Sequence, residues 1–374
     1  MKDIRLACFS DIHLGHRRND SHEMIKALDK CIHQEGLLER IDILFLAGDV
    51  FDRLLDLNHA AISDIDYWIA KLIHGCETHG VTLRVLEGTP SHDREQSERF
   101  VTIHKLMDSK TNFRYVKQVE IEYIPHLECN VLYIPDEFSP TCAETLAVVQ
   151  KAMKAQALEQ VDIAVMHGQF AHQLPAEIKD LDCHDTEAYL NLTKSLILIG
   201  HVHHHSVMDK IVAQGSFDRL AHGEEEAKGY VYVEIKNGVA RPYFIENKDA
   251  RIYKTIAVYG MDMVQVYEHL TQALDGMLPL SCIRIEAEPT HPVFANFNEV
   301  MRAHSTMVWS KLAKTIKGDH EKVRIVNEFD KWSPVEITPA NIEDLLMRSL
   351  AKRNLSEEQL KLSRHHLQAV LNEV

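Results

Sequence analysis

Short, mostly apolar runs recur through the first part of the chain, the one from Val81 being weaker than the others. They are Ile4 to Phe9, Ile41 to Ala47, Val81 to Leu86, Val161 to Met166 and Leu196 to Ile199. Runs of this length without polar alternation are typical of strands buried on both faces. Segments with apolar residues at helical spacing lie between them, as from Met24 to Ile32 and from Ile65 to Ile73. Because strand and helix alternate, the sequence predicts an α/β fold.

Histidine or aspartate follows each of these runs. The five clusters are Asp11-Ile12-His13, Gly48-Asp49-Val50-Phe51-Asp52, Ser91-His92-Asp93, Met166-His167-Gly168 and Gly200-His201-Val202-His203. Open α/β sheets form their ligand sites just beyond the carboxyl ends of the strands. We therefore expect the five clusters to converge in space. The 24 histidines of the chain are not informative by number, and most of them are expected to be surface or hydrogen-bonded core residues.

The donor types in these clusters indicate a reactive metal centre. Carboxylates and imidazoles without thiolates suit manganese, iron or zinc in a reactive site rather than a structural zinc cluster. Asp49 is the natural bridging ligand, because each of its two oxygens can bind one ion. Two ions roughly 3.5 to 4 Å apart can share a hydroxide nucleophile and orient a phosphate. The chemistry that this predicts is hydrolysis at phosphorus.

Charge and composition restrict the class of protein. The formal net charge of −15 argues against a protein that simply coats nucleic acid. It does not exclude a nuclease, because bound cations or a partner could supply the positive charge that binds the phosphate backbone. No apolar run is long enough to cross a membrane, and no secretory signal is evident. The seven cysteines include no Cys-x-x-Cys pair, which favours reduced thiols. We therefore expect a soluble cytoplasmic protein, associated with the nucleoid or, if viral, located in the host cytoplasm.

The order of the five clusters resembles the calcineurin-like metallophosphoesterases. Within that superfamily, Ser10 to Gly15, Gln214 to Arg219 and Arg241 to Phe244 resemble the SbcD-type DNA repair nucleases, whose partner is the SMC-like ATPase SbcC. The resemblance implies a four-layer αββα sandwich with a small α+β capping domain and carboxyl-terminal helices. It divides the chain into a nuclease domain at 1–245, a capping or DNA-selection domain at 250–330 and helices at 336–374. The helices either pack onto this protein or bind a partner, and the resemblance favours the second, with the ATPase subunit as the partner.

The resemblance also assigns the site residues. It gives one ion to Asp11, His13, Asp49 and His203. It gives the second ion to Asp49, His167 and His201. His92 resembles the family's catalytic histidine, which is not a ligand but contacts the phosphate and protonates the leaving group. Asp93 would orient the His92 imidazole from behind.

Two positions depart from the family pattern. Ser91 stands where the family usually has an asparagine that donates an oxygen to the second ion. A serine hydroxyl is a poorer ligand, so that ion could be held more weakly, through a water, or by a rearranged loop. Asp52 stands where related nucleases often have histidine. It could hydrogen-bond a ligand histidine, or it could cap a helix or pair with Arg53 or Arg94.

The leading functional prediction is a nuclease subunit of an SbcCD-like complex with exonuclease and endonuclease activity in DNA recombination, repair or end processing. The ions would be two Mn²⁺, with Mg²⁺, Fe²⁺ or Zn²⁺ as alternatives, and the protein would form a homodimer. One alternative is a metallophosphoesterase that acts on small phosphodiesters or phosphoproteins. Another is an inactive scaffold that retains the fold and recruits an ATPase.

Overall fold

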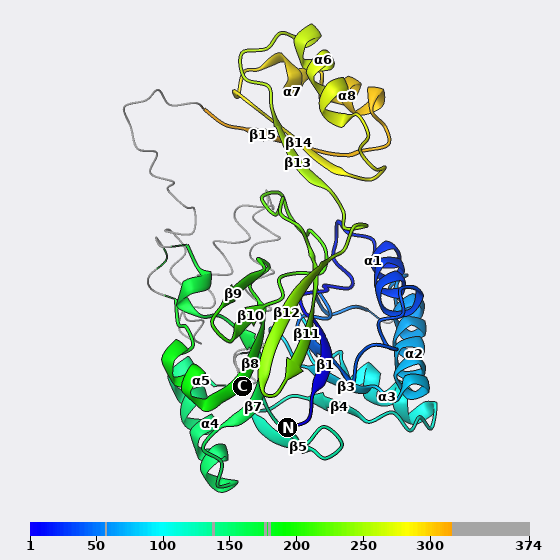
Figure 1. Ribbon diagram of the computed structural model, residues 1–374. Helices are drawn as coiled ribbons and strands as arrows, with labels where there is room; N and C mark the ends of the chain where they lie inside the picture. Colours follow the sequence, from blue (N-terminus) through cyan, green and yellow to red (C-terminus); the bar gives the residue numbers. More distant parts are fainter. Residues whose placement is uncertain (57, 137–138, 176–177, 179–180, 316–374) are drawn as a thin grey trace, which may run out of the picture. The chain divides into compact units, whose positions relative to one another are not determined.

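The computed structural model describes residues 1–315, except 57, 137–138, 176–177 and 179–180 (Figure 1). The chain divides into two compact units, Met1–Lys314 and Thr315–Val374. The predicted helices at 336–374 and the end of the predicted 250–330 domain lie outside the described residues. No described helix has the length and apolar character needed to span a bilayer.

Two six-stranded sheets form the larger part of the first unit, which is an α/β sandwich. In hydrogen-bonded order, the first sheet contains β12 (Val239–Glu246), β11 (Gly229–Lys236), β1 (Ile4–Phe9), β2 (Ile43–Ala47), β3 (Thr82–Leu86) and β4 (Phe113–Val116). The second contains β5 (Glu120–Ile124), β6 (Cys129–Ile134), β7 (Val161–Gly168), β8 (Thr193–His201), β10 (Ile211–Ala213) and β9 (Ser206–Met208). Each of the five predicted apolar runs is therefore a strand. Strands β1 to β4 are parallel, as are β6, β7, β8 and β10.

Helices pack against one face of each sheet. Those of the first sheet are α1 (Ser21–Asp29), continued by a π-helical turn η1 (Lys30–Gln34), α2 (Ile62–His79) and α3 (Glu98–Leu106). Those of the second sheet are α4 (Cys142–Ala155) and α5 (Thr186–Leu192), with a short 3₁₀ turn η2 (Ala171–Gln173) between them in sequence.

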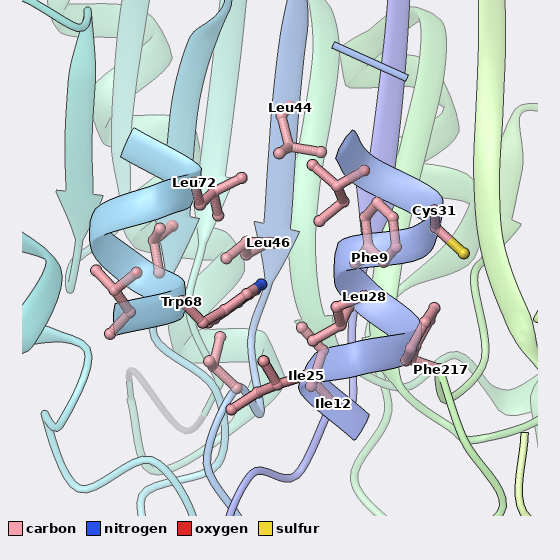
Figure 2. Close-up of a cluster of buried hydrophobic side chains, with 14 of the residues drawn as sticks. Phe9, Ile12, Ile25, Leu28, Cys31, Leu44, Leu46, Trp68, Leu72 and Phe217 are labelled. Carbon is pink, nitrogen blue, oxygen red and sulfur yellow. The ribbon is translucent and has the colours of Figure 1, made fainter. Parts of the chain in front are cut away.

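Strand alternation divides the apolar side chains between separate cores. On β1, Leu6 and Cys8 pack between the two sheets, whereas Ala7 and Phe9 pack toward the helices. Figure 2 shows Phe9 and Leu46 beside Leu28 of α1 and Trp68 of α2. A strand with both faces covered is mostly apolar, which explains the apolar runs in the sequence.

A smaller segment at residues 253–313 has its own sheet and its own core. The sheet order is β13 (Tyr253–Ala257), β14 (Cys282–Ala287) and β15 (Val308–Ala313). Its helices are α6 (Met263–Leu274), α7 (Pro292–Ala295) and α8 (Phe297–Ala303). All three strands are parallel, so the expected α+β character is wrong. Parallel neighbours need crossover connections, and the helices supply them, which makes the segment α/β. Its role as a cap stays a prediction.

Candidate metal centre

The predicted site residues come together at the carboxyl ends of the parallel strands. Three sets of side chains each have their ligand atoms within 4.8 Å of one another. These sets are Asp11, His13 and His203; His13, Asp49 and His92; and Asp49, His167 and His201. Asp49 belongs to two of the sets, as the sequence suggested for a bridging carboxylate. The structure thus gathers all six predicted ligands and His92 in one place, while their roles as ligands stay predictions.

Hydrogen bonds between loops hold the backbone of the site. The Asp11 N–H donates to Gly48 O at 3.1 Å, and the His13 N–H donates to Asp49 O at 3.0 Å. The His201 N–H donates to Asp11 Oδ1 at 3.0 Å, which ties the second sheet to the first. These bonds fix the loops after β1, β2 and β8 against one another.

Four of the predicted ligands have left-handed backbone conformations. The φ angles are 51° at Asp11, 56° at His13, 50° at Asp49 and 94° at His201. Such angles are uncommon for residues with a Cβ, although aspartate and histidine tolerate them better than most. Residues in sparsely populated regions cost about 1–3 kcal/mol each and concentrate at functional sites. Their clustering here supports a functional role for these loops.

Glycine at position 48 lets the loop after β2 approach His167. Gly48 has φ of +86°, and a Cβ at this position would lie 2.2 Å from His167 Nδ1. Any other residue would therefore displace the imidazole from Asp49.

Hydrogen bonds orient the imidazoles so that one nitrogen of each faces the centre. His167 Nδ1 donates to Ala47 O at 2.7 Å, and its Nε2 lies 3.3 Å from Asp49 Oδ1. His203 Nδ1 lies 3.0 Å from Glu224 Oε1, and its Nε2 lies 3.3 Å from His13 Nε2. A nitrogen that donates outward leaves the other with a lone pair for a cation.

Asp52 contacts a third ring. Its Oδ1 lies 3.4 Å from His13 Nδ1, so of the two roles considered for Asp52 the contact with a predicted ligand histidine is the one observed. Burial raises the pKa of Asp52, but the neighbouring imidazoles of His13, His16 and His92 together outweigh it, and the net pKa is lowered.

The electrostatics of the centre favour a bound positive charge. Burial raises the pKa of Asp49, yet His167 and His92 outweigh it, and the net pKa is strongly lowered. Burial lowers the pKa of His167, but the charge and hydrogen bond of Asp49 together with the charges of Asp11 and Asp136 outweigh it, and the net pKa is raised well above the usual value. The buried carboxylates are thus stabilised by a neighbouring positive charge, which either a protonated imidazole or a metal ion supplies. Because the donors are carboxylates and imidazoles, the residues fit divalent ions of the manganese, iron or zinc type.

His92 stands at the more open side of the centre. Its side chain is 37% exposed, and its Nδ1 lies 2.9 Å from Asp49 Oδ2. That hydrogen bond raises the pKa of His92, which favours the charged ring.

The expected contact between Asp93 and His92 is wrong. Asp93 is fully buried, and its two oxygens accept hydrogen bonds from Phe51 N and Gly88 N, both at 2.8 Å. Asp93 therefore joins the loops after β2 and β3, and Asp49 is the carboxylate that contacts His92.

Ser91, the first candidate for the oxygen ligand of the second ion, is exposed. Thr89 lies in the centre instead. Its Oγ1 lies 3.2 Å from Asp49 Oδ2 and 3.4 Å from His167 Nε2. Sequence reasoning missed Thr89, as well as Asp136 and Glu224. A signal existed for two of them: Thr89 directly follows the glycine after β3, and Asp136 comes two residues after the apolar strand β6.

No family model matches the chain, and no curated protein matches it by sequence. Among solved structures, TT1561 of Thermus thermophilus is similar, with 11% identity and a TM-score of 0.36 over 65% of this chain and 99% of that chain. A second crystal structure has a TM-score of 0.38 at the same identity and coverage. TM-scores this low carry no argument about function, which therefore has to be argued from the site.

Proposed function

We propose that this chain is a two-metal phosphodiester hydrolase of the calcineurin-like metallophosphoesterase type. The observation that carries the proposal is the overlap of the three ligand sets, in which Asp49 joins the set of His167 and His201 to the set of His13 and His92. One shared carboxylate with imidazoles on both sides suits a pair of cations rather than a single one. The separate cores on the two faces of each sheet support the four-layer αββα arrangement of that superfamily.

In this proposal, the side chains bind the two ions, and one further side chain donates a proton to the leaving group. Asp11, His13, Asp49 and His203 would bind one ion, and Asp49, His167 and His201 would bind the other. Two bound divalent cations would supply Lewis-acid activation of the phosphate and of the attacking water. His92 would protonate the leaving group. Its Nδ1 is engaged by Asp49, so its Nε2 is the atom that would donate a proton to the departing oxygen.

We further propose that the substrate is DNA and that the protein is the nuclease subunit of an SbcCD-like complex. A pocket of about 530 Å³ lies beside the loop that follows His13, and its lining includes Arg17, Arg18 and Arg53. Arg17 and Arg18 are exposed, and neither takes part in an ion pair among residues 1–315 as described. The acidic residues of the lining are Asp20 and Asp64; Asp20 caps α1 and Asp64 lies 3.3 Å from His22. In a chain of net charge −15, unpaired arginines next to the centre support contact with a phosphate backbone. The proposed ATPase partner would bind the predicted helices at 336–374, outside the described residues.

The test compares DNA with a small phosphodiester in the presence of Mn²⁺. Full-length protein should degrade linear duplex and hairpin DNA, and it should also hydrolyse bis(p-nitrophenyl) phosphate. The double variant R17A/R18A should lose most of its activity on DNA while its turnover of the small ester is unchanged. Robust turnover of only the small ester by the wild type would favour the alternative of a small-molecule or phosphoprotein phosphoesterase. Inactivity of metal-loaded protein on every phosphoester would favour the scaffold.

A further inference from the structure

One carboxylate in the centre has no counterpart among the residues that the sequence assigned. Asp136 follows β6, and β6, β7 and β8 are parallel neighbours. The carboxyl end of β6 therefore lies at the same edge of the sheet as His167 and His201. Topology alone thus brings Asp136 beside the second ligand set.

The contacts of Asp136 agree with this position. Its Oδ2 lies 3.7 Å from His201 Nδ1 and 3.1 Å from Thr89 Oγ1. The side chain is only 13% exposed. A largely buried carboxylate that faces a predicted ligand nitrogen and is hydrogen-bonded by a neighbouring hydroxyl is in the environment of a metal ligand rather than of a solvated surface charge.

Thr89 connects Asp136 to the rest of the set. Its Oγ1 lies 3.1–3.4 Å from single atoms of Asp49, His167, His201 and Asp136. Its backbone N–H also donates to Asp49 Oδ1 at 2.6 Å. Atoms that bind one ion at roughly 2.0–2.2 Å are themselves separated by roughly 3.0–3.5 Å. Among the proposed ligand atoms, Asp49 Oδ1 lies 3.3 Å from His167 Nε2 and Asp136 Oδ2 lies 3.7 Å from His201 Nδ1, which is close to this spacing.

We propose that Asp136 is a carboxylate ligand of the second ion and that Thr89 is a positioning residue that holds this carboxylate toward His201. This inference rests on the proposed metal-dependent function. It replaces the neutral amide oxygen of the family pattern with a negative charge, and it removes Ser91 from consideration as a ligand. The second ion would then have two carboxylates, Asp49 and Asp136, and two imidazoles.

The charge of this set has a chemical consequence. Asp136 adds a second carboxylate to a set whose other carboxylate, Asp49, is shared with the first ion, and oxygen-rich sites suit harder cations better than sites dominated by imidazole. The second site should therefore accept Mn²⁺ or Mg²⁺ more readily than an otherwise equal site with a neutral ligand. The loss expected from Ser91 at the asparagine position is thereby compensated within this chain.

The experiment measures Mn²⁺ binding rather than activity. Full-length protein is stripped of metal and titrated with Mn²⁺ by calorimetry, and bound manganese is counted by mass spectrometry and observed by electron paramagnetic resonance. Wild-type protein should bind two ions per chain with the spectrum of a coupled pair. D136N should keep one ion at the wild-type affinity and bind the other at least tenfold more weakly, with the spectrum of isolated Mn²⁺. Asparagine can still accept the hydrogen bond of Thr89, so D136N should remain folded, which circular dichroism and the melting temperature check.

Two controls separate ligation from other effects of the substitution. Asp182 lines the same pocket of about 540 Å³ as Asp136, and its Oδ2 accepts a hydrogen bond from Cys142 N at 2.6 Å. D182N removes an equal charge from this pocket while a side-chain oxygen remains to accept that bond, and S91A removes the hydroxyl first considered as a ligand. Both variants should bind two ions as the wild type does. T89V should weaken the second ion less than D136N does, and it should add little when combined with D136N.

Several results would overturn the inference. Binding of both ions with wild-type affinities by D136N and also by D136A would exclude Asp136 as a ligand, since the asparagine of D136N alone could still offer an oxygen. An equal loss of Mn²⁺ affinity in D182N would show that the effect comes from the charge of the pocket and not from ligation. Full additivity of T89V with D136N would exclude the positioning role of Thr89. Failure of the wild type to bind any divalent ion would refute the proposed function itself, and the assignment of Asp136 would fall with it. That outcome is distinguishable because it appears before any variant is made.

Discussion

Glu224 offers a sharp test of how the first of the two proposed ions is held. His203 Nδ1 lies 3.0 Å from Glu224 Oε1, and this contact directs His203 Nε2 toward His13. Burial raises the pKa of Glu224, but the hydrogen bond with His203 and the charge of Lys228 outweigh it, and the net pKa is about 2. Glu224 is thus a charged acceptor that selects the His203 tautomer with a free Nε2.

The change E224Q should weaken Mn²⁺ binding at this ion by about 10–100-fold, which corresponds to roughly 1.4–2.8 kcal/mol. Glutamine has no charge to attract the Nδ1 proton, and its amide can donate to Nδ1 instead. The proton would then move to Nε2, the nitrogen that the ion requires. Calorimetric titration of metal-free protein with Mn²⁺ measures the loss.

Glu226 provides the matched control for this change. Lys228 is almost fully buried, with Nζ at 3.2 Å from Glu224 Oε2 and 2.7 Å from Glu226 Oε1. Either glutamine variant therefore removes one of two charged partners of Lys228, but only E224Q changes the acceptor of His203. Equal Mn²⁺ affinities of E224Q and E226Q would refute the orienting role of Glu224, whatever their common loss of stability.

The other two predictions concern catalysis and the contact between the sheets. H92A should lower phosphodiester turnover by about 10²–10⁴-fold with unchanged manganese content, because His92 is proposed as a proton donor rather than a ligand; loss of both ions would show that its role is misassigned. E122A should lower the free energy of unfolding by about 3–5 kcal/mol in urea titrations, because it leaves the buried charge of Arg84 without its carboxylate partner. Nε and Nη2 of Arg84 donate to Glu122 at 2.8 and 2.7 Å. The double variant R84M/E122L should recover most of that loss, and a double variant as unstable as E122A would contradict this account.

The strands that carry the site were predictable because their environment leaves a simple trace in the sequence. A strand covered on both faces is mostly apolar, so β2 is apolar throughout and β1 is interrupted only by the exposed Arg5. The carboxyl-end rule for parallel sheets then brings Asp11, Asp49 and His167 together without any knowledge of the loops. The same rule applied to β6 would have found Asp136, whose strand Cys129–Ile134 is interrupted only by Asn130.

Contacts within the loops were not predictable in this way. Counting back from His92 led to Ser91, but the turn after β3 directs Thr89 into the centre and leaves Ser91 exposed. Asp93 is next to His92 in sequence, yet its oxygens satisfy two backbone N–H groups of other loops. Side-chain direction in a turn depends on each residue's φ and ψ, which spacing along the sequence does not give. The parallel order of β13, β14 and β15 was likewise invisible, because it depends on how connections cross.

The backbone of the centre shows which parts of the fold provide stability and which form the site. Left-handed conformations at Asp11, Asp49 and His201 are unfavourable locally, so the cross-loop bonds to Gly48 O and Asp11 Oδ1 must hold them. Those bonds are positioned in turn by strands whose side chains fill cores on both faces of each sheet. The strands therefore supply the free energy that keeps the loops in conformations they would not adopt alone. In this fold the ligand geometry is a property of the sandwich as a whole, which is why residues from β1 through β8 can form one site although no single segment encodes it.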